Sequence, residues 1–311
     1  MNRADRTIIV ICGPTAVGKT AYAIETALAF HGEIVSCDSM QLYKYMNIGS
    51  AKPTAEEQAR VRHYLVDQID PAQPFSAAKY QEMAKAAIEE IFAKGKVPVI
   101  AGGTGLYLNA LLYDMDFSAP PGDPSLREEL YALAETDGPE ALHRQLRELD
   151  PDAAARIHPN NVKKVVRAVE AARLGSKVGD FSSDLKPTTD YSPILIGLTR
   201  DRAELYDRIN RRVDLLMRAG LLKEVRGLLD MGLDEGDISM KGIGYKELIG
   251  YFHGRYGLDE AVDLVKKNTR HYAKRQLTWF KRYRDMQWFN ISAYDSDAAC
   301  QEDMFQWLKS K

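Results

Sequence analysis

The stretch Gly13-Pro14-Thr15-Ala16-Val17-Gly18-Lys19-Thr20 decides the fold. It has the form G-x-x-x-x-G-K-[ST], follows an apolar β-branched run from Thr7 to Cys12, and opens a helix-like segment from Thr20 to Phe30. A strand, a glycine loop and a helix in this order form a phosphate-binding loop, because loop amides and the helix N-terminus point at phosphate oxygens. We therefore expect a diphosphate or triphosphate group to bind here.

Each part of this loop has a physical task. The glycines permit the tight backbone path, Lys19 adds a positive charge, and the Thr20 hydroxyl can ligate Mg²⁺. Such a loop serves kinases, ATPases and GTPases alike, since it recognises charge and shape and not the group attached to the phosphate. The predicted diphosphate- or nucleotide-binding residues are Gly13, Pro14, Thr15, Ala16, Val17, Gly18, Lys19 and Thr20.

Three further apolar runs predict more strands of the same sheet. They extend from Glu33 to Cys37, from Val97 to Ala101 and from Ile194 to Leu198, and a helical stretch from Ala77 to Ala93 lies between the first two. Buried runs that alternate with helices predict an α/β fold, a P-loop NTPase-like parallel sheet flanked by helices. Its binding crevice then lies beyond the carboxyl ends of the strands.

The alternation of strands and helices stops near Phe117, which predicts an inserted all-helical domain over residues 117–192. Residues 1–116 and 193–311 would form the catalytic core, whose C-terminal part is mostly helical. The expected segments of the insert are a linker from Ala119 to Pro124, helix-like stretches from Leu126 to Leu149 and from Asn160 to Leu174, and a mobile polar loop from Gly175 to Ser192.

Bulk composition excludes several classes of protein. The 42 Lys and Arg against 44 Asp and Glu exclude a uniformly basic surface, so a nucleic-acid site requires a local cluster. The three cysteines, Cys12, Cys37 and Cys300, have no C-x-x-C spacing and predict no zinc site. No apolar stretch approaches the length of a membrane span. A cytoplasmic protein, monomeric and without a membrane partner, is expected.

Asp38 directly follows the second apolar run, within Asp38-Ser39-Met40-Gln41-Leu42-Tyr43. We expect it to face the crevice near the phosphate loop, where an acid can serve catalysis. It could instead cap a turn or hold a metal ion. The third run ends in Gly102-Gly103-Thr104-Gly105 and not in the Asp that holds Mg²⁺ in a Walker-type NTPase. The usual hydrolytic apparatus is therefore not visible.

Several motifs in order resemble those of the tRNA dimethylallyltransferases, of the bacterial type. The first three are G-P-T-A-x-G-K-T, D-S-M-Q-L-Y and A-G-G-T-G-L-Y, and further matches lie at residues 208–214, 242–247 and 269–280. The resemblance implies transfer of a dimethylallyl group from dimethylallyl diphosphate to the exocyclic amine (N6) of the adenine immediately 3′ of the anticodon in tRNA. Diphosphate is released, and Mg²⁺ is the implied cofactor.

The resemblance also implies roles for particular residues. Thr15 to Thr20 would hold the diphosphate, Lys19 and Arg212 would neutralise it, and Asp38 would accept the proton of the adenine amine. The leaving charge needs electrostatic stabilisation, and a neutral amine is a poor nucleophile, so each role fits the chemistry. The implied catalytic residues are therefore Asp38, Arg212 and Lys19, with Thr20 at the metal.

A basic cluster lies between Leu264 and Arg284, which contain eight Lys or Arg and no Asp or Glu. On a helix Lys267, Arg270, Lys274 and Lys281 fall near one face, while Ala273, Leu277 and Phe280 pack inward. A solvated basic face with core aromatic residues is the alternative. The tRNA-contacting positions that the resemblance implies are Asp38, Ser39, Met40, Gln41, Thr104, Arg127, Lys163, Lys164, Val165, Val166, Arg167, Lys241, Gly242, Ile243, Gly244, Tyr245, Lys246, Lys274, Arg275, Gln276, Leu277, Thr278, Trp279, Phe280 and Lys281.

Three other functions stay open on the residues alone. A P-loop small-molecule kinase would share the loop and the sheet, but it requires a pocket for a phosphate acceptor. A prenyltransferase acting on free adenine nucleotide would share the chemistry, yet it has no use for the basic helix. A non-catalytic tRNA-binding protein would explain the basic helix and leave the phosphate loop opposite Asp38 unexplained.

Overall fold

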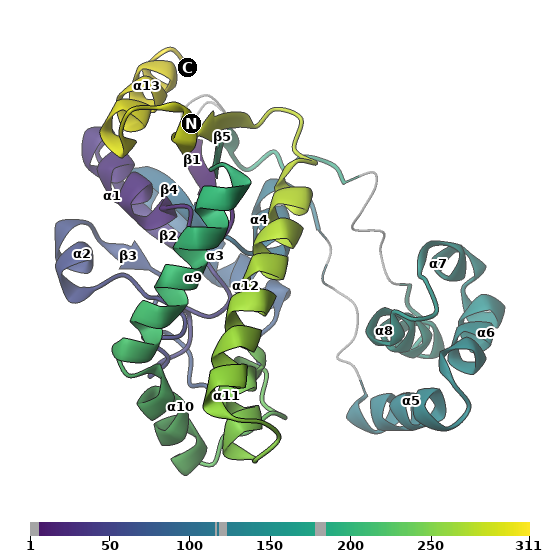
Figure 1. Ribbon diagram of the computed structural model, residues 1–311. Helices are drawn as coiled ribbons and strands as arrows, with labels where there is room; N and C mark the ends of the chain where they lie inside the picture. Colours follow the sequence, from purple (N-terminus) through teal and green to yellow (C-terminus); the bar gives the residue numbers. More distant parts are fainter. Residues whose placement is uncertain (1–5, 116, 118–122, 178–184) are drawn as a thin grey trace. The chain divides into compact units, whose positions relative to one another are not determined.

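A computed structural model describes residues 6–115, 117, 123–177 and 185–311 of the chain. Within these ranges six strands form one sheet in the order β3-β2-β4-β1-β5-β6, and every neighbouring pair is parallel. The predicted α/β fold with a parallel sheet flanked by helices is confirmed (Figure 1). The strands are β1 Thr7–Cys12, β2 Gly32–Cys37, β3 His63–Tyr64, β4 Val97–Gly102, β5 Ser192–Thr199 and β6 Gln287–Asn290.

The four predicted strands are the central ones, and the two that the sequence did not predict lie at the edges. β1 pairs with β4 on one side and with β5 on the other, so its apolar run is buried on both faces. β3 has two residues and β6 has four, which is too short for a periodic apolar signal.

Helices cover both faces of the sheet. Ile9 and Ile11 of β1 pack in a core cluster with residues of α1, α9 and α13. Val10 and Cys12 point to the opposite face, beside Leu108 of α4. In the described part of the chain, no helix is both long enough and apolar enough to cross a membrane. The helices of this unit are α1 Lys19–Ala29, α2 Ala55–Arg60, α3 Ala77–Ala93, α4 Gly105–Leu112, α9 Arg202–Arg218, α10 Leu221–Asp230, α11 Tyr245–Phe252, α12 Leu258–Phe280 and α13 Asp297–Lys309.

A second compact unit spans Tyr113–Pro187, and the first comprises the chain up to Leu112 and from Thr188. The second unit has an apolar core of its own, in which Leu130, Leu142 and Val169 are buried. Its helices are α5 Pro124–Thr136, α6 Pro139–Leu149, α7 Pro151–Arg156 and α8 Val162–Arg173.

One helical expectation for this unit is wrong. The stretch from Leu126 to Leu149 is two helices, because Gly138 adopts a left-handed backbone with φ of 84° and Pro139 starts α6. The short helix α7 was not predicted either. Most of the expected linker and part of the expected mobile loop fall on residues 118–122 and 178–184, which lie outside the described residues.

Candidate active site

The phosphate loop leaves β1 and enters α1 by a path that two glycines make possible. A Cβ atom at Gly13 would lie 2.5 Å from the carbonyl oxygen of Leu198, so the loop and β5 approach too closely for any side chain there. Gly18 is the N-cap of α1 with φ of 114°, and no side chain caps the helix. The first amides of α1 therefore have no acceptor within the helix and face the loop.

A cavity of about 370 Å³ opens at this loop. Asp38 from the end of β2 and Arg212 from α9 line it together with the loop. Of the remaining loop residues, Val17 is buried in the core, and Pro14 uses its carbonyl oxygen to accept a hydrogen bond from Lys19. The loop residues on the cavity wall are Thr15, Ala16, Gly18, Lys19 and Thr20.

Two cations on this wall, Lys19 and Arg212, are partly buried among protein atoms. Burial among protein atoms lowers the pKa of Lys19 to about 8, with Arg212 adding to the decrease and Asp38 opposing it. Burial likewise lowers the pKa of Arg212. The Lys19 Nζ atom lies 2.9 Å from the Pro14 carbonyl oxygen, which is its hydrogen-bond acceptor. An anion in the cavity would be attracted to both charges in a medium that screens them weakly.

The Asp38 carboxylate both caps a turn and faces two cavities. Its Oδ1 atom accepts a hydrogen bond from the Met40 amide at 2.9 Å, so the carboxylate caps the turn after β2. The same carboxylate lines the phosphate cavity and a neighbouring cavity. Asp38 can therefore cap the turn and also act in catalysis, because the hydrogen bond to Oδ1 holds the carboxylate at the cavity wall.

The neighbouring cavity has a volume of about 420 Å³ and a more apolar wall. Tyr43, Phe75, Tyr107 and Leu216 contribute to that wall. Because the two cavities have residues in common, they meet at Asp38 and Arg212. The shared residues are Thr15, Asp38, Ser50, Ala51, Arg212 and Tyr272.

Many of the predicted tRNA-contacting residues of the core gather at this apolar cavity. Gln41 lines the phosphate cavity instead and accepts a hydrogen bond from Ser36, while the Thr104 hydroxyl accepts one from the Ser39 amide. Tyr245 and Phe280 are fully buried, so their side chains support their neighbours. The predicted residues on the apolar wall are Asp38, Ser39, Met40, Lys241, Gly242, Ile243, Gly244, Lys246 and Arg275.

The outer face of α12 forms a shallow groove beyond these cavities. Lys274 and Lys281 are exposed, and the Arg282 guanidinium lies 5.1 Å from the ring centre of Trp279. Arg270, in contrast, donates to Asn210 of α9, so the predicted basic face is interrupted there. The groove residues are His271, Lys274, Arg275, Thr278, Trp279 and Arg282. We refer to these six residues together with Lys281 as the α12 face.

Gln276 has a structural role that the sequence reasoning missed. Its Oε1 atom accepts a hydrogen bond from the Thr15 amide at 2.8 Å, and its Nε2 atom donates to the Gly103 carbonyl at 2.9 Å. The side chain thereby links α12 to the phosphate loop. A signal was present, since Gln276 interrupts the apolar inward stripe of Ala273 and Phe280, and a buried amide there requires partners.

The predicted residues of the second unit form an arrangement of their own. Arg127 and Arg167 both pair with Glu170, at 2.8 Å and 2.9 Å, and Glu170 is only 1% exposed. Lys163 and Lys164 are exposed on α8, whereas Val165 and Val166 pack in the unit's core. The two lysines are therefore available on the surface, and the two valines hold the helix in place.

Comparison with known proteins identifies the family. The model of the family described as IPP transferase matches residues 41–283. The tRNA dimethylallyltransferase of Alkaliphilus oremlandii is 51% identical over 94% of this chain and 93% of that protein. The protein of the same name from Clostridioides difficile is 48% identical over 97% of each chain.

Solved structures agree with the sequence comparison. The full-length tRNA isopentenylpyrophosphate transferase of Bacillus halodurans has a TM-score of 0.74 and 41% identity, over 98% of this chain and 96% of that one. A eukaryotic dimethylallyltransferase acting on tRNA has a TM-score of 0.78 at 24% identity, which supports the fold alone. The family expected from the motifs is thus confirmed, and the chain belongs to the IPP transferase family.

Proposed function

We propose that this protein transfers a dimethylallyl group from dimethylallyl diphosphate to the exocyclic amine of the adenine immediately 3′ of the anticodon in tRNA. The observation that carries the proposal is the meeting of two unlike cavities at Asp38, one lined by the phosphate loop and one by apolar and aromatic side chains. Relatives named tRNA dimethylallyltransferase align with nearly the whole chain, which adds support.

The phosphate cavity is suited to a departing diphosphate. When the allylic carbon–oxygen bond breaks, negative charge grows on the leaving oxygen. Lys19, Arg212 and the amides at the N-terminus of α1 would stabilise that charge, since all of them line or face the cavity. Desolvation of the two cations strengthens the attraction compared with the same groups in water.

Asp38 would accept the proton that the adenine amine loses. As the nitrogen–carbon bond forms and the carbon–oxygen bond breaks, the amine becomes acidic, and a carboxylate within hydrogen-bond reach can take its proton. Asp38 lines both cavities, so it would lie between the nucleophile on the apolar side and the leaving group on the phosphate side.

Mg²⁺ fits the oxygen donors of the phosphate cavity. The Thr20 hydroxyl is a hard ligand on its wall, and the diphosphate would supply further oxygens. Among the described residues no group of three or more His, Cys, Asp and Glu is arranged to hold a metal ion, so the ion would depend on the substrate for ligands. When bound there, it would contribute positive charge against the leaving diphosphate.

The tRNA would bind through the anticodon stem-loop. A base that reacts at its exocyclic amine has to leave its stack, and a single-stranded loop makes this least costly. The apolar cavity would receive the adenine, and the α12 face would follow the phosphate backbone. The exposed Lys163 and Lys164 of the second unit are proposed as further contacts. One chain lines both cavities, so we propose that the acting unit is a monomer. We also propose that it acts in the cytoplasm.

The test is an incubation of the purified protein with Mg²⁺, radiolabelled dimethylallyl diphosphate and either unmodified tRNA or adenosine monophosphate. Label in the tRNA supports the proposal. Label in the mononucleotide alone would assign the protein to prenyl transfer onto free nucleotide. Turnover of ATP in a parallel incubation that contains ATP, without label in either acceptor, would refute prenyl transfer and favour a phosphotransferase.

A further inference from the structure

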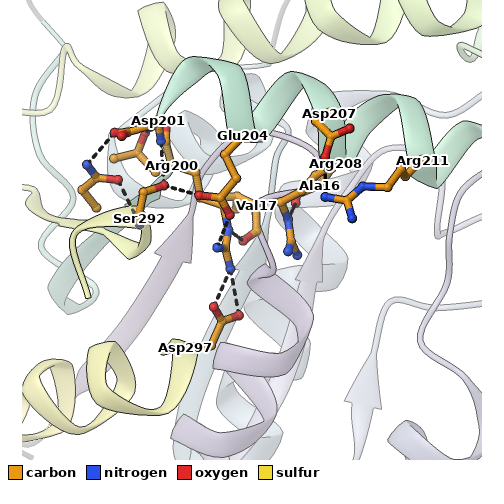
Figure 2. A network of polar contacts seen from close by, with 12 residues as sticks. Ala16, Val17, Arg200, Asp201, Glu204, Asp207, Arg208, Arg211, Ser292 and Asp297 are labelled. Carbon is orange, nitrogen blue, oxygen red and sulfur yellow. Dashed lines mark hydrogen bonds and ion pairs between the residues drawn. The ribbon is translucent and has the colours of Figure 1, made fainter. Parts of the chain in front are cut away.

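Two arginines hold the outer side of the phosphate loop, as Figure 2 shows. The Nε atom of Arg208 donates to the Ala16 carbonyl oxygen, and the Nε atom of Arg200 donates to the Val17 carbonyl oxygen, each at 3.1 Å. Arg200 directly follows β5, and Arg208 lies on α9. Neither arginine is on the wall of the phosphate cavity.

These two hydrogen bonds act on consecutive peptide units. In a planar trans peptide the carbonyl and the following amide point in opposite directions. Holding the carbonyls of Ala16 and Val17 toward the arginines therefore directs the amides of Val17 and Gly18 the other way. The Val17 amide has a long contact of 3.4 Å with the Pro14 carbonyl, and Gly18 itself lies on the wall of the cavity.

The backbone of the loop needs this support. Ala16 has φ of 65°, a left-handed conformation that residues with a Cβ atom rarely adopt, and Gly18 has φ of 114°. Val17 between them has a negative φ, so the sign of φ alternates along the loop. Alternation of this kind turns successive amides toward one concave side and forms an anion-binding nest. The unfavourable conformation of Ala16 persists because its surroundings hold it.

Arg200 is itself paired with two acidic side chains. Its side chain is 5% exposed, and it pairs with Glu204 at 2.6 Å and with both carboxylate oxygens of Asp297 at 2.8 Å. Glu204 also accepts a hydrogen bond from the Ser292 hydroxyl. The network in Figure 2 thus connects the start of α13 to the backbone of the phosphate loop.

We propose that Arg208 and Arg200 are positioning residues, which hold the carbonyls of Ala16 and Val17 so that the empty loop already has the shape that binds a diphosphate. The identity of the anion rests on the proposed function. Arg208 also lies one helical turn from Arg212, so its charge alone could favour an anion nearby. The two explanations predict different affinities for diphosphate when Ala16 is replaced by glycine.

The experiment measures binding of inorganic diphosphate by calorimetry to the full chain and its variants. Arg208→Met should weaken binding about tenfold, because the loop carbonyl loses a charge-assisted hydrogen bond. Adding Ala16→Gly to that variant should restore most of the affinity, since glycine adopts the left-handed conformation without support. Arg211→Met is the matched control, because Arg211 is on the same helix but is exposed and pairs with Asp207; its affinity should equal that of the wild type.

Arg208→Lys separates charge from positioning and remains informative if Arg208→Met does not fold. It keeps the charge but loses the guanidinium geometry, and we expect about threefold weaker binding that Ala16→Gly again restores. Wild-type affinity in a folded Arg208→Met or Arg208→Lys variant would overturn the proposal. So would affinity that Ala16→Gly fails to restore. Failure of the wild type to prenylate tRNA would refute the proposed function and leave these binding results standing.

Discussion

The phosphate loop presents backbone amides that tertiary contacts hold in place, whereas the α12 face presents lysine and arginine side chains that reach solvent. Arg208, Arg200 and Gln276 each bond directly to the backbone of the loop. On the α12 face, Lys274 and Lys281 are exposed. Both regions would attract phosphate, but the first is partly buried and held by tertiary contacts, whereas the second is exposed and screened by salt. Single substitutions in the first region should therefore lower the reaction rate or the affinity strongly, and single substitutions in the second region should lower the affinity only slightly.

The largest effect is expected at Asp38, where the two cavities meet. Asp38→Ala should lower the rate of prenyl transfer at saturating substrates by a factor of about 10²–10⁴, because the reaction loses its proton acceptor. Binding of tRNA, measured by filter retention, should stay largely intact, since the α12 face is unchanged. Normal turnover in the variant would remove Asp38 from its proposed role.

The next effect concerns Lys19 and depends on pH. The lowered pKa of about 8 means that Lys19 in the empty protein is charged below pH 8 and loses its proton as the pH rises through that value. Affinity for diphosphate should therefore decrease above pH 8, and binding there should be accompanied by proton uptake. Lys19→Met should weaken diphosphate binding about 10- to 100-fold at pH 7.

Calorimetry of the wild type and Lys19→Met in parallel, from pH 6 to pH 9.5, isolates this titration from that of the ligand. The difference in affinity between the two proteins should shrink as the pH passes 8 and Lys19 loses its charge. A difference that stays constant over the whole range would show that Lys19 keeps its charge and that its burial has no consequence for binding.

A smaller and salt-dependent effect is expected on the α12 face. Lys274→Ala should weaken all tRNA substrates alike, on the order of threefold near physiological salt, and should reduce the slope of log affinity against log salt by about one. Lys309→Ala on the exposed end of α13 provides the matched control and should change neither quantity. An unchanged slope for Lys274→Ala would favour a solvated basic face without a role in tRNA binding.

The same contrast explains how much could be predicted from the sequence. The central strands and the position of the phosphate loop could be predicted from local signals, namely the apolar run from Thr7 to Cys12 and the glycines that follow it. The resemblance implied catalytic roles for Asp38 and Arg212, and the structure puts both on the wall of one cavity. The edge strands β3 and β6 were missed because pairing with a neighbour, and not their own pattern, makes them strands.

The supporting contacts could not be predicted, because they join residues far apart in the chain. Gln276 and Thr15 are 261 positions apart, and Arg208 and Ala16 are 192 apart. An Arg on a polar helix face is interpreted as a solvent-exposed charge until the fold brings a backbone carbonyl within its reach. The opposite holds at Gly138 in the second unit, where the local sequence Asp137-Gly138-Pro139 divides the helix-like stretch that was expected from Leu126 to Leu149.

The smallest predicted effect tests how far the organisation of the phosphate loop extends. Asp297 pairs with Arg200 through both carboxylate oxygens, but its side chain is 56% exposed, so solvent weakens the pair. Asp297→Asn should therefore raise the dissociation constant for inorganic diphosphate only about twofold, and less at high salt. Asp303→Asn, on the same helix but bonded to Tyr294, should leave it unchanged. A tenfold loss of affinity in Asp297→Asn, as large as that expected for Arg208→Met, would contradict this expectation. It would mean that the conformation of the loop depends on α13 as much as on α9.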